Sequence, residues 1–440
     1  MSSIFCPALF LAAPSSGQGK TTITAAIARF HRLRGRDVRI FKMGPDYLDP
    51  QILEQASGNP VVQLDLWMAG EDYCRYQFYT AAQTADLILV EGAMGMFDGE
   101  PSSADLATTF NIPIALVMDV KGMAQTTAAL ATGLANYRSD VCVAGLIANN
   151  CASDRHRQLI ADALPDDLPL LAAISRDPAI SLPERHLGLV QASEVSDMLE
   201  ARFNAAANMI EYSALAELPA LVEFSPRELP LVPPCLRGLR IGVARDEAFS
   251  FIYAANLELL ANMGAELRYF SPLHDTQLPD VDALWLPGGY PELHVKALVE
   301  NSKMRSQVRD FYLANKVILA ECGGFMYCLE NIKDLEGHSH GMLGLLTGEA
   351  VMRERGGCQG MQYAELPEGE LRGHSHHRSA TENTSLPIAY GRRQRHTAPG
   401  EAIYRSRGLT ASYLHLFFPS NPVAIGSLFR GGTNSGTSFE

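Results

Sequence analysis

The chain has 440 residues, of which 47% are hydrophobic and 19% charged, and its formal net charge is −13. This apolar share is enough for two buried cores and excludes a largely disordered chain. The acidic balance without a basic tract argues against nucleic acid or an anionic membrane as a partner, and no apolar run reaches the length of a membrane span. The eight cysteines contain no C-x-x-C pair, which favours free thiols in the cytoplasm over a zinc site or disulfides.

The first motif is a glycine-rich loop, Ala-Pro-Ser-Ser-Gly-Gln-Gly-Lys-Thr-Thr at residues 13–22. It follows an apolar, strand-like stretch at 8–12 and precedes a helical pattern at 23–33, which is the setting of a phosphate-binding loop. Its glycines let backbone N–H groups approach phosphate oxygens, and its lysine can reach the β- and γ-phosphates. An ordinary turn at a helix start is the alternative. The residues assigned to ATP are Gly17, Gly19, Lys20, Thr21 and Thr22, with Thr21 also a ligand of Mg²⁺.

Further strand-length apolar runs alternate with helical stretches along the first half, at residues 38–41, 87–90, 114–118 and 143–147. This alternation predicts a parallel α/β sheet, which binds ligands beyond the carboxyl ends of its strands. Lys42 and Glu91 each stand at such a strand end. Glu91 is expected to hold Mg²⁺ and Lys42 to assist a transferring phosphate, with exposed surface positions as the alternatives. Asn149 and Asn150 follow another strand, where they fit adenine recognition or a turn equally well.

Five prolines between residues 219 and 234 predict a linker. We therefore expect two domains, at 1–235 and 236–440. A second α/β series follows, with strands at 239–243, 283–287 and 317–320. The polar stretch at 381–399 is expected to be a loop.

A second chemical centre is expected in the latter half. Cys322 follows a strand and precedes two glycines, which is typical of a nucleophile on a strand-to-helix turn whose thiolate is favoured by the helix N-terminus. Gly288 and Gly289 also follow a strand and could present backbone N–H groups to an oxyanion. His415 is the expected general base. A buried structural cysteine is the alternative for Cys322.

The chain resembles a known family, the glutamine-dependent a,c-diamide synthases that amidate cobyrinic or hydrogenobyrinic acid in cobalamin biosynthesis. The resemblance covers nearly the whole chain. It rests on the phosphate loop at 13–22, Phe-Lys-Met-Gly-Pro-Asp-Tyr-Leu-Asp-Pro (41–50), Val-Glu-Gly-Ala-Met-Gly-Met-Phe-Asp-Gly (90–99), Leu-Pro-Gly-Gly-Tyr-Pro-Glu (286–292), Ala-Glu-Cys-Gly-Gly-Phe-Met-Tyr (320–327) and Ser-Tyr-Leu-His (412–415).

The resemblance implies an N-terminal, P-loop domain similar to dethiobiotin synthetase and a C-terminal class I glutamine amidotransferase-like domain. It implies that Asp46, Tyr47, Leu48 and Asp98 line the synthetase site together with Lys42. For Asp49, a helix N-cap before Pro50 is at least as good an interpretation. Many class I amidotransferases carry a glutamate two residues after the histidine, where this chain has Phe417. The prediction is therefore a Cys322–His415 dyad.

The implied reaction uses ATP with Mg²⁺ to activate a corrinoid carboxylate as an acyl phosphate, which ammonia from L-glutamine then converts to an amide. The implied partners are these small molecules, with a homo-oligomer left open. Ni-sirohydrochlorin a,c-diamide synthesis is the nearest alternative. A P-loop ATPase switch or metal-insertion factor is an alternative of another class, which Cys322 argues against. The histidines at 374, 376 and 377 suggest a metal site, but no accompanying set of potential ligands in the sequence has metal-ligand spacing.

Overall fold

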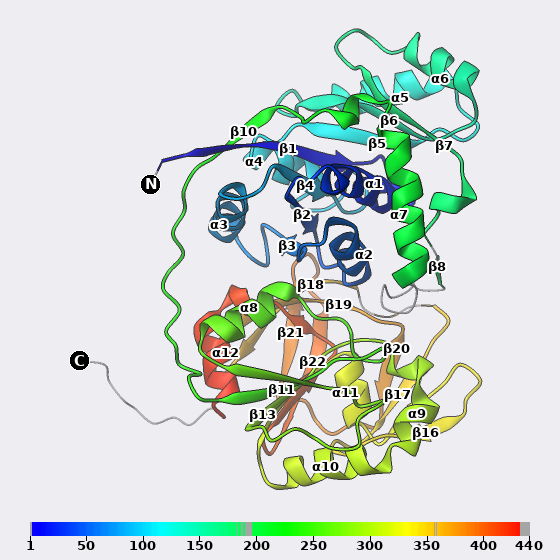
Figure 1. Cartoon of the computed structure of the whole chain (residues 1–440). Coiled ribbons are helices and arrows are strands. Elements are labelled where there is room, and N and C mark those ends of the chain that lie inside the picture. The colour runs from blue at the N-terminus through cyan, green and yellow to red at the C-terminus, as the bar shows by residue number, and fades with distance from the viewer. Residues whose placement is uncertain are drawn as a thin grey trace. The chain divides into compact units, whose positions relative to one another are not determined.

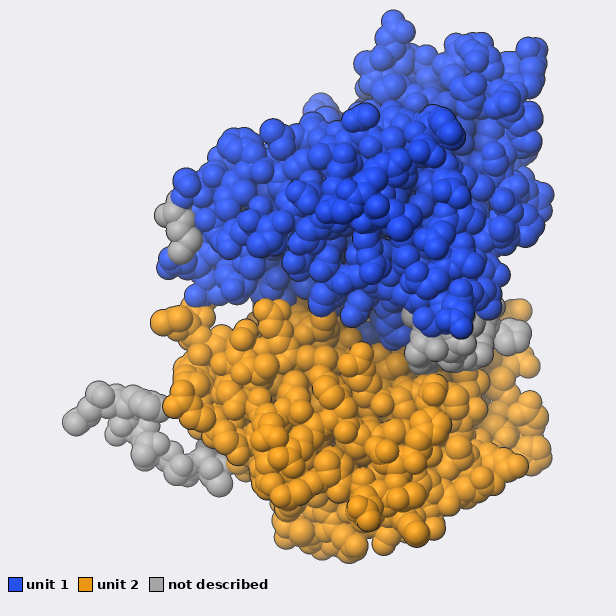
Figure 2. Space-filling view, in the orientation of Figure 1, with its two compact units in different colours: residues 1–229 blue, residues 230–440 orange. Residues whose placement is uncertain are grey.

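The computed structural model describes residues 2–182, 184–185, 188–189, 196–355, 357 and 359–431. The chain divides into two compact units, residues 1–229 and 230–440 (Figure 2). The division lies in the proline-rich stretch, a few residues before the position expected from the sequence. Within the described residues, no helix is both long and apolar enough to cross a membrane.

The first unit is built on a parallel sheet with the strand order β3-β2-β4-β1-β5-β6-β7, and β10 adds to β1 in the antiparallel direction (Figure 1). Its strands are β1 (Ile4–Ala12), β2 (Val38–Met43), β3 (Val62–Leu64), β4 (Leu87–Glu91), β5 (Ile114–Asp119), β6 (Val143–Cys151), β7 (Leu170–Ser175) and β10 (Leu221–Phe224), with a separate short pair β8 (Glu184–Arg185) and β9 (Gly188–Leu189). The predicted strands of this half are confirmed.

Helices cover both faces of this sheet. They are α1 (Lys20–Leu33), α2 (Leu48–Ser57), α3 (Glu71–Ala82), α4 (Ser103–Thr109), α5 (Thr126–Ala135), α6 (Asp154–Ala161) and α7 (Ser196–Ile210). One core joins side chains of α1, α2 and α7 to one face of the sheet. Another core joins side chains of α3, α4, α5 and α6 to the opposite face. The strands are buried on both sides, which explains why they appear in the sequence as continuous apolar runs.

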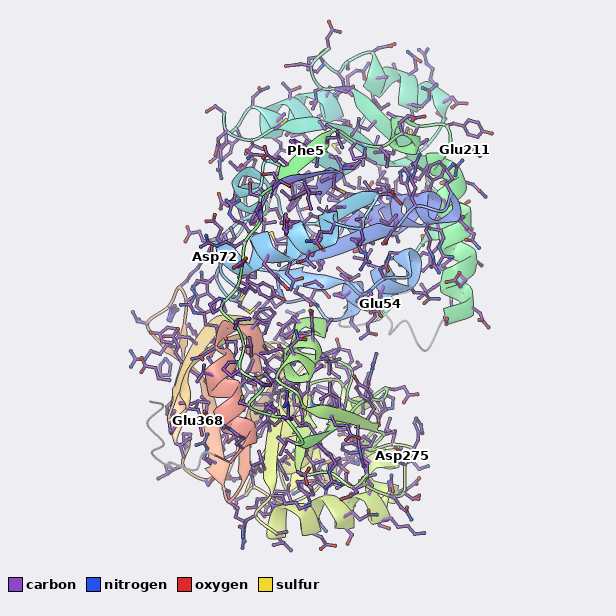
Figure 3. The ribbon with its side chains drawn as sticks, turned by 60° about the vertical axis from the view of Figure 1, so that its left-hand side comes forward. Phe5, Glu54, Asp72, Glu211, Asp275 and Glu368 are labelled. Carbon is purple, nitrogen blue, oxygen red and sulfur yellow. The ribbon has the colours of Figure 1, made fainter. Side chains whose placement is uncertain are left out.

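The end of the first unit is tied back to α3. Arg227 donates to a carboxylate oxygen of Asp72 at 2.6 Å, and Asp72 is labelled in Figure 3. The antiparallel pairing of β10 with β1 precedes this contact along the chain. The chain leaving β10 is therefore anchored to the first unit as far as residue 227.

The second unit contains a ten-stranded mixed sheet in the order β12-β11-β13-β14-β23-β22-β21-β18-β19-β24. In this order, the neighbours among the first five strands, β12, β11, β13, β14 and β23, pair in parallel. Every later pair, from β23–β22 to β19–β24, is antiparallel. The strands are β11 (Arg240–Ala244), β12 (Glu266–Phe270), β13 (Ala283–Leu286), β14 (Val317–Glu321), β18 (Gln359–Leu366), β19 (Gly369–His376), β21 (Ala389–Arg393), β22 (Pro399–Ser406), β23 (Leu409–Ser412) and β24 (His415–Leu416).

A smaller sheet and α-helices complete the described part of this unit. The sheet has β15 (Asn331–Lys333), β16 (Ser339–Gly341), β17 (Glu349–Met352) and β20 (Ser379–Glu382). The helices are α8 (Ala254–Asn262), α9 (Val295–Glu300), α10 (Ser302–Leu313), α11 (Gly323–Cys328) and α12 (Pro422–Phe429). One core joins α8 and α12 to the large sheet, and another joins α9, α10 and α11 to it. The expected loop at 381–399 is wrong in part, because β21 lies within it and pairs with β18 and β22.

Candidate active sites

The phosphate loop lies between β1 and α1, and the ends of two further strands hold it in place. The backbone N–H of Asp119 donates to the side-chain oxygen of Gln18 at 2.8 Å, and the Asn149 amide donates to the Gln18 carbonyl at 2.9 Å. Gly19 has φ 89°, and a Cβ there would overlap the Asn149 amide nitrogen. Only glycine therefore fits at position 19. Asn149 contacts the loop itself, which is a role that neither sequence interpretation included.

Lys20 and Thr21 both reach the segment that follows β4. The Lys20 ammonium donates to the Met94 carbonyl at 2.9 Å, and the Thr21 hydroxyl donates to Glu91 Oε1 at 3.0 Å. Burial and then the nearby Lys42 charge lower the pKa of Lys20. Thr22 lies one residue further into α1, and Gly17 adopts a left-handed φ of 78° in the loop. The phosphate loop and the β4 end thus form one polar site.

A buried ion-pair network lies at the carboxyl ends of β2 and β4. Lys42 is 4% exposed, and its ammonium nitrogen lies 2.7 Å from Glu91 Oε1 and 3.0 Å from Asp49 Oδ2. Burial alone would lower the pKa of Lys42, but these carboxylates raise it, so the side chain is charged. The surface alternatives for Lys42 and Glu91 are therefore wrong. Asp49 is an ion-pair partner of Lys42 inside α2.

The Glu91 carboxylate retains an unused oxygen. Its Oε2 is buried and accepts no hydrogen bond from the residues that the structure describes. Carboxylate and hydroxyl oxygens are the ligands that Mg²⁺ prefers, and the Thr21 hydroxyl is already at this carboxylate. The residues present therefore fit a divalent cation beside the phosphate loop.

The residues that the resemblance placed in the synthetase site are divided between α2 and the loop after β4. Asp46 Oδ1 accepts the backbone N–H groups of Leu48 and Asp49 at 3.0 and 3.2 Å, so Asp46 caps the start of α2 and the expected N-cap role of Asp49 is wrong. Tyr47 and Leu48 are largely buried at this start. Asp98 is exposed and accepts the Gly95 N–H at 3.1 Å. Asp46 and Lys42 approach to 3.9 Å.

In the second unit, Cys322 occupies a tight turn between β14 and α11. Its backbone has φ 46° and ψ −104°, a conformation that residues other than glycine rarely adopt. Such strain persists where surrounding structure enforces it and is common at catalytic nucleophiles. The Cys322 N–H donates to the Ser412 carbonyl at 2.8 Å, which joins the turn to the segment leading to His415.

The Pro-Gly-Gly loop lies between Cys322 and His415. A Cβ on Gly288 would overlap Cε1 of His415 and lie 2.9 Å from its Nδ1. A Cβ on Gly323 would lie 2.9 Å from the Gly289 nitrogen, and the Gly324 N–H donates to the Pro287 carbonyl at 3.0 Å. The structure therefore brings three sequence-predicted elements, the cysteine turn, the glycine loop and His415, into one site.

The protonation state of this site differs from the expectation. Burial, followed by the nearby Glu292 charge, raises the pKa of the Cys322 thiol. Burial also lowers the pKa of His415 well below its usual range. Burial therefore acts against the thiolate that was expected from the helix N-terminus, although the Gly323 backbone N–H lowers the pKa of the thiol. Both shifts favour the neutral thiol and the neutral imidazole, and a neutral imidazole can accept a proton.

Position 417 contributes packing. Phe417 is buried, and its ring lies edge-on to Tyr253 with centroids 5.5 Å apart. The segment carrying His415 is instead held by Glu321, whose Oε1 accepts the Leu416 N–H at 2.7 Å and whose Oε2 accepts the Trp285 indole N–H at 2.8 Å. Sequence reasoning gave Glu321 no role. The available signal was a carboxylate at the end of a buried strand, directly before the nucleophile.

The histidine-rich segment belongs to a buried polar network. The His377 ring stacks on Tyr413 with centroids 3.9 Å apart, and its Nε2 lies 3.1 Å from Glu401 Oε1. The Ser375 hydroxyl also donates to that carboxylate, at 3.2 Å. No group of three or more potential metal ligands occurs among the described side chains.

Comparison with known proteins assigns each half of the chain to a family. Residues 9–190 match the CobQ/CobB/MinD/ParA nucleotide binding domain, and residues 240–423 match the CobB/CobQ-like glutamine amidotransferase domain. The matches cover both polar sites described above. Together they confirm the two-domain α/β fold predicted from the sequence.

Similar proteins match over the whole length. The hydrogenobyrinate a,c-diamide synthase of Stutzerimonas stutzeri is 51% identical over 98% of this chain and 100% of its own. The enzyme of the same name from Pseudomonas aeruginosa is 49% identical over 97% of this chain and 98% of its own. The cobyrinate a,c-diamide synthase of Herminiimonas arsenicoxydans is 42% identical over 94% of each chain. The chain therefore belongs to the hydrogenobyrinate and cobyrinate a,c-diamide synthase family and is a glutamine-hydrolysing ligase.

Proposed function

We propose that this chain amidates the a and c side-chain carboxylates of hydrogenobyrinic or cobyrinic acid, with ATP and glutamine as co-substrates. The observation that carries the proposal is that one chain contains both a phosphate loop with a buried Lys42–Glu91 pair and a strained cysteine turn beside a histidine. A carboxylate is a poor electrophile and requires activation, whereas glutamine requires a nucleophile to release its ammonia. Each site matches one of these needs.

In the amidotransferase unit, the Cys322 sulfur attacks the glutamine side-chain carbonyl as its proton passes to His415. The tetrahedral oxyanion lies at the glycine loop, where backbone N–H groups of Gly289 and of the turn after Cys322 can donate to it. His415 returns the proton to the departing ammonia, leaving a glutamyl thioester. Water then hydrolyses the thioester to glutamate and the free thiol. The neutral state of both groups suits this sequence, because the base begins unprotonated.

In the nucleotide-binding unit, the substrate carboxylate attacks the γ-phosphate of ATP, giving an acyl phosphate and ADP. Ammonia then displaces phosphate and forms the amide. Lys20 follows the loop glycines and can move from the Met94 carbonyl onto a phosphate oxygen. Lys42 provides a second positive charge beside Glu91. Thr21 and Glu91 would hold Mg²⁺, which neutralises charge on the phosphates when bound.

The substrate assignment draws on the names of the similar enzymes and on the motif at 41–50, which places Asp46, Tyr47 and Leu48 at the start of α2. Asp46 connects this segment to the ion-pair network, because its Oδ2 lies 3.9 Å from the Lys42 ammonium nitrogen. We assign them, with Asp98, to binding and orienting the tetrapyrrole carboxylates.

The test is incubation of the purified chain with ATP, Mg²⁺ and glutamine against hydrogenobyrinic acid, cobyrinic acid and Ni-sirohydrochlorin in parallel. Mass spectrometry of each product counts the amides formed. Diamide from a corrinoid acid, with glutamate and ADP released, is the expected result. Diamide from Ni-sirohydrochlorin alone would transfer the assignment to that tetrapyrrole. ATP hydrolysis without any amide would contradict amidation.

A further inference from the structure

Three glutamates raise the pKa of the Cys322 thiol, and two of them accept hydrogen bonds from other side chains or from the backbone. These are Glu292, Glu401 and Glu321. Glu321 accepts from the Trp285 indole and the Leu416 backbone, and Glu401 accepts from His377 and Ser375. Both therefore serve the architecture of the site. Glu292 differs from them.

Glu292 is held at the glycine loop, in the short 3-10 turn Pro291–Leu293 that packs against α11. A Cβ on Gly323 would lie 2.8 Å from the Pro291 ring, so this turn lies directly against the residue that follows Cys322. Of the three glutamates, Glu292 has the strongest effect on the Cys322 thiol. Glu292 therefore belongs to a turn that packs against the Cys322 turn, and its charge acts on the thiol.

One oxygen of Glu292 lacks a partner. Its Oε2 is buried, and no donor in the described part of the chain reaches it, although the residue as a whole is partly exposed. An uncompensated carboxylate in such a place is costly, and burial raises the pKa of Glu292 to about 7. A cation that enters with the substrate would supply the missing charge and hydrogen bond.

We propose that Glu292 binds the α-ammonium group of glutamine and thereby selects glutamine over amides that lack this group. The assignment rests on the proposed glutaminase function of the Cys322 site. Free glutamine carries one ammonium group, and the side-chain amide must reach the cysteine while the ammonium remains fixed. Glu292 is thus a specificity residue at the same loop that would bind the oxyanion.

The test compares glutamine with glutaric acid monoamide, which has the same side-chain amide and carboxylate but no amino group. Glutaminase kcat/KM is measured for both amides in the parent and in Glu292→Gln, with ATP, Mg²⁺ and corrinoid present. The glutamine-to-monoamide ratio is expected to fall by roughly 10- to 100-fold in the variant, because a hydrogen bond to a charged group is lost only for glutamine. Glu292→Asp, which keeps the charge, should retain part of the preference.

Glu401→Gln is the matched control, since Glu401 is another buried carboxylate beside the same cysteine but already has partners. It should change both amides alike and leave the ratio intact. An unchanged glutamine-to-monoamide ratio in Glu292→Gln would overturn the assignment. If both amides lost activity equally, Glu292 would instead have a role in the chemistry or in packing. A parent enzyme that uses neither amide would instead contradict the proposed glutaminase function.

Discussion

Gly288 lies so close to His415 that adding a single methyl group at position 288 tests the amidotransferase site. In Gly288→Ala, the new methyl group would overlap Cε1 of His415 and lie 2.9 and 3.1 Å from its two ring nitrogens. Because ordinary contacts begin at about 3.4 Å, the ring or the loop must move by roughly 1 Å. A displacement of about 1 Å in a catalytic group can reduce turnover by about 10²-fold. We expect a loss of this size in glutamine-dependent amidation.

The assay measures amide formation with glutamine and, separately, with ammonium chloride as the nitrogen source. The ammonia-dependent rate should stay near that of the parent, since the altered residue is in the amidotransferase unit. Gly341→Ala is the matched control, because a Cβ at Gly341 has its nearest neighbours at 3.9 Å. Its rates should match the parent with both nitrogen sources. Near-normal glutamine use by Gly288→Ala would refute the positioning of His415 by the glycine loop.

Three further predictions follow from the two sites. His415→Ala should lower the glutamine-dependent rate by roughly 10²–10⁴-fold while sparing ammonia use; full glutamine activity would mean that another group is the base. Lys20→Ala or Glu91→Ala should reduce amidation by about 10²-fold or more with either nitrogen source, and normal ammonia-dependent turnover would remove the altered residue from phosphoryl transfer. The thermal midpoint of Glu292→Gln should rise relative to the parent between about pH 5 and 7. Burial raises the pKa of Glu292 in the folded protein to about 7. When the pH lies between the ordinary pKa of a glutamate and this raised value, the unfolded state loses the proton while the folded state keeps it, so the parent loses stability as the pH rises through this range. A midpoint difference that is constant with pH would contradict this.

The parallel core of each unit was predictable because its strands are buried on both faces and leave continuous apolar runs. The polar motifs then follow from topology, since parallel strands gather their carboxyl ends at one edge of a sheet. Lys42 and Glu91 are 49 residues apart in sequence, yet their strands β2 and β4 are neighbours and pair in register at these two residues. The antiparallel extension was harder to predict. β21 has the burial pattern of a half-exposed strand and is rich in arginine, so it resembles a loop in the sequence.

Sequence reasoning missed contacts that depend on three-dimensional placement. Asp49 stands before a proline at a helix start, which suggests a cap, but it turns toward Lys42 while Asp46 accepts the first amides of α2. The burial that raises the pKa of the Cys322 thiol was missed for a similar reason, because the degree of burial at the turn cannot be read from flanking glycines. Glu292 lies inside a motif quoted for family resemblance, but its unpartnered oxygen is visible only in the structure.

The central claim is that one chain carries two separable chemistries, and Cys322→Ala tests it most directly. The variant is incubated with ATP, Mg²⁺ and corrinoid acid, with either glutamine or ammonium chloride, and the product is identified by mass. We predict diamide formation with ammonium chloride at a rate near that of the parent and none above background with glutamine, because only glutamine cleavage requires the thiol. Full activity with glutamine, or loss of activity with both nitrogen sources in a folded variant, would contradict the account.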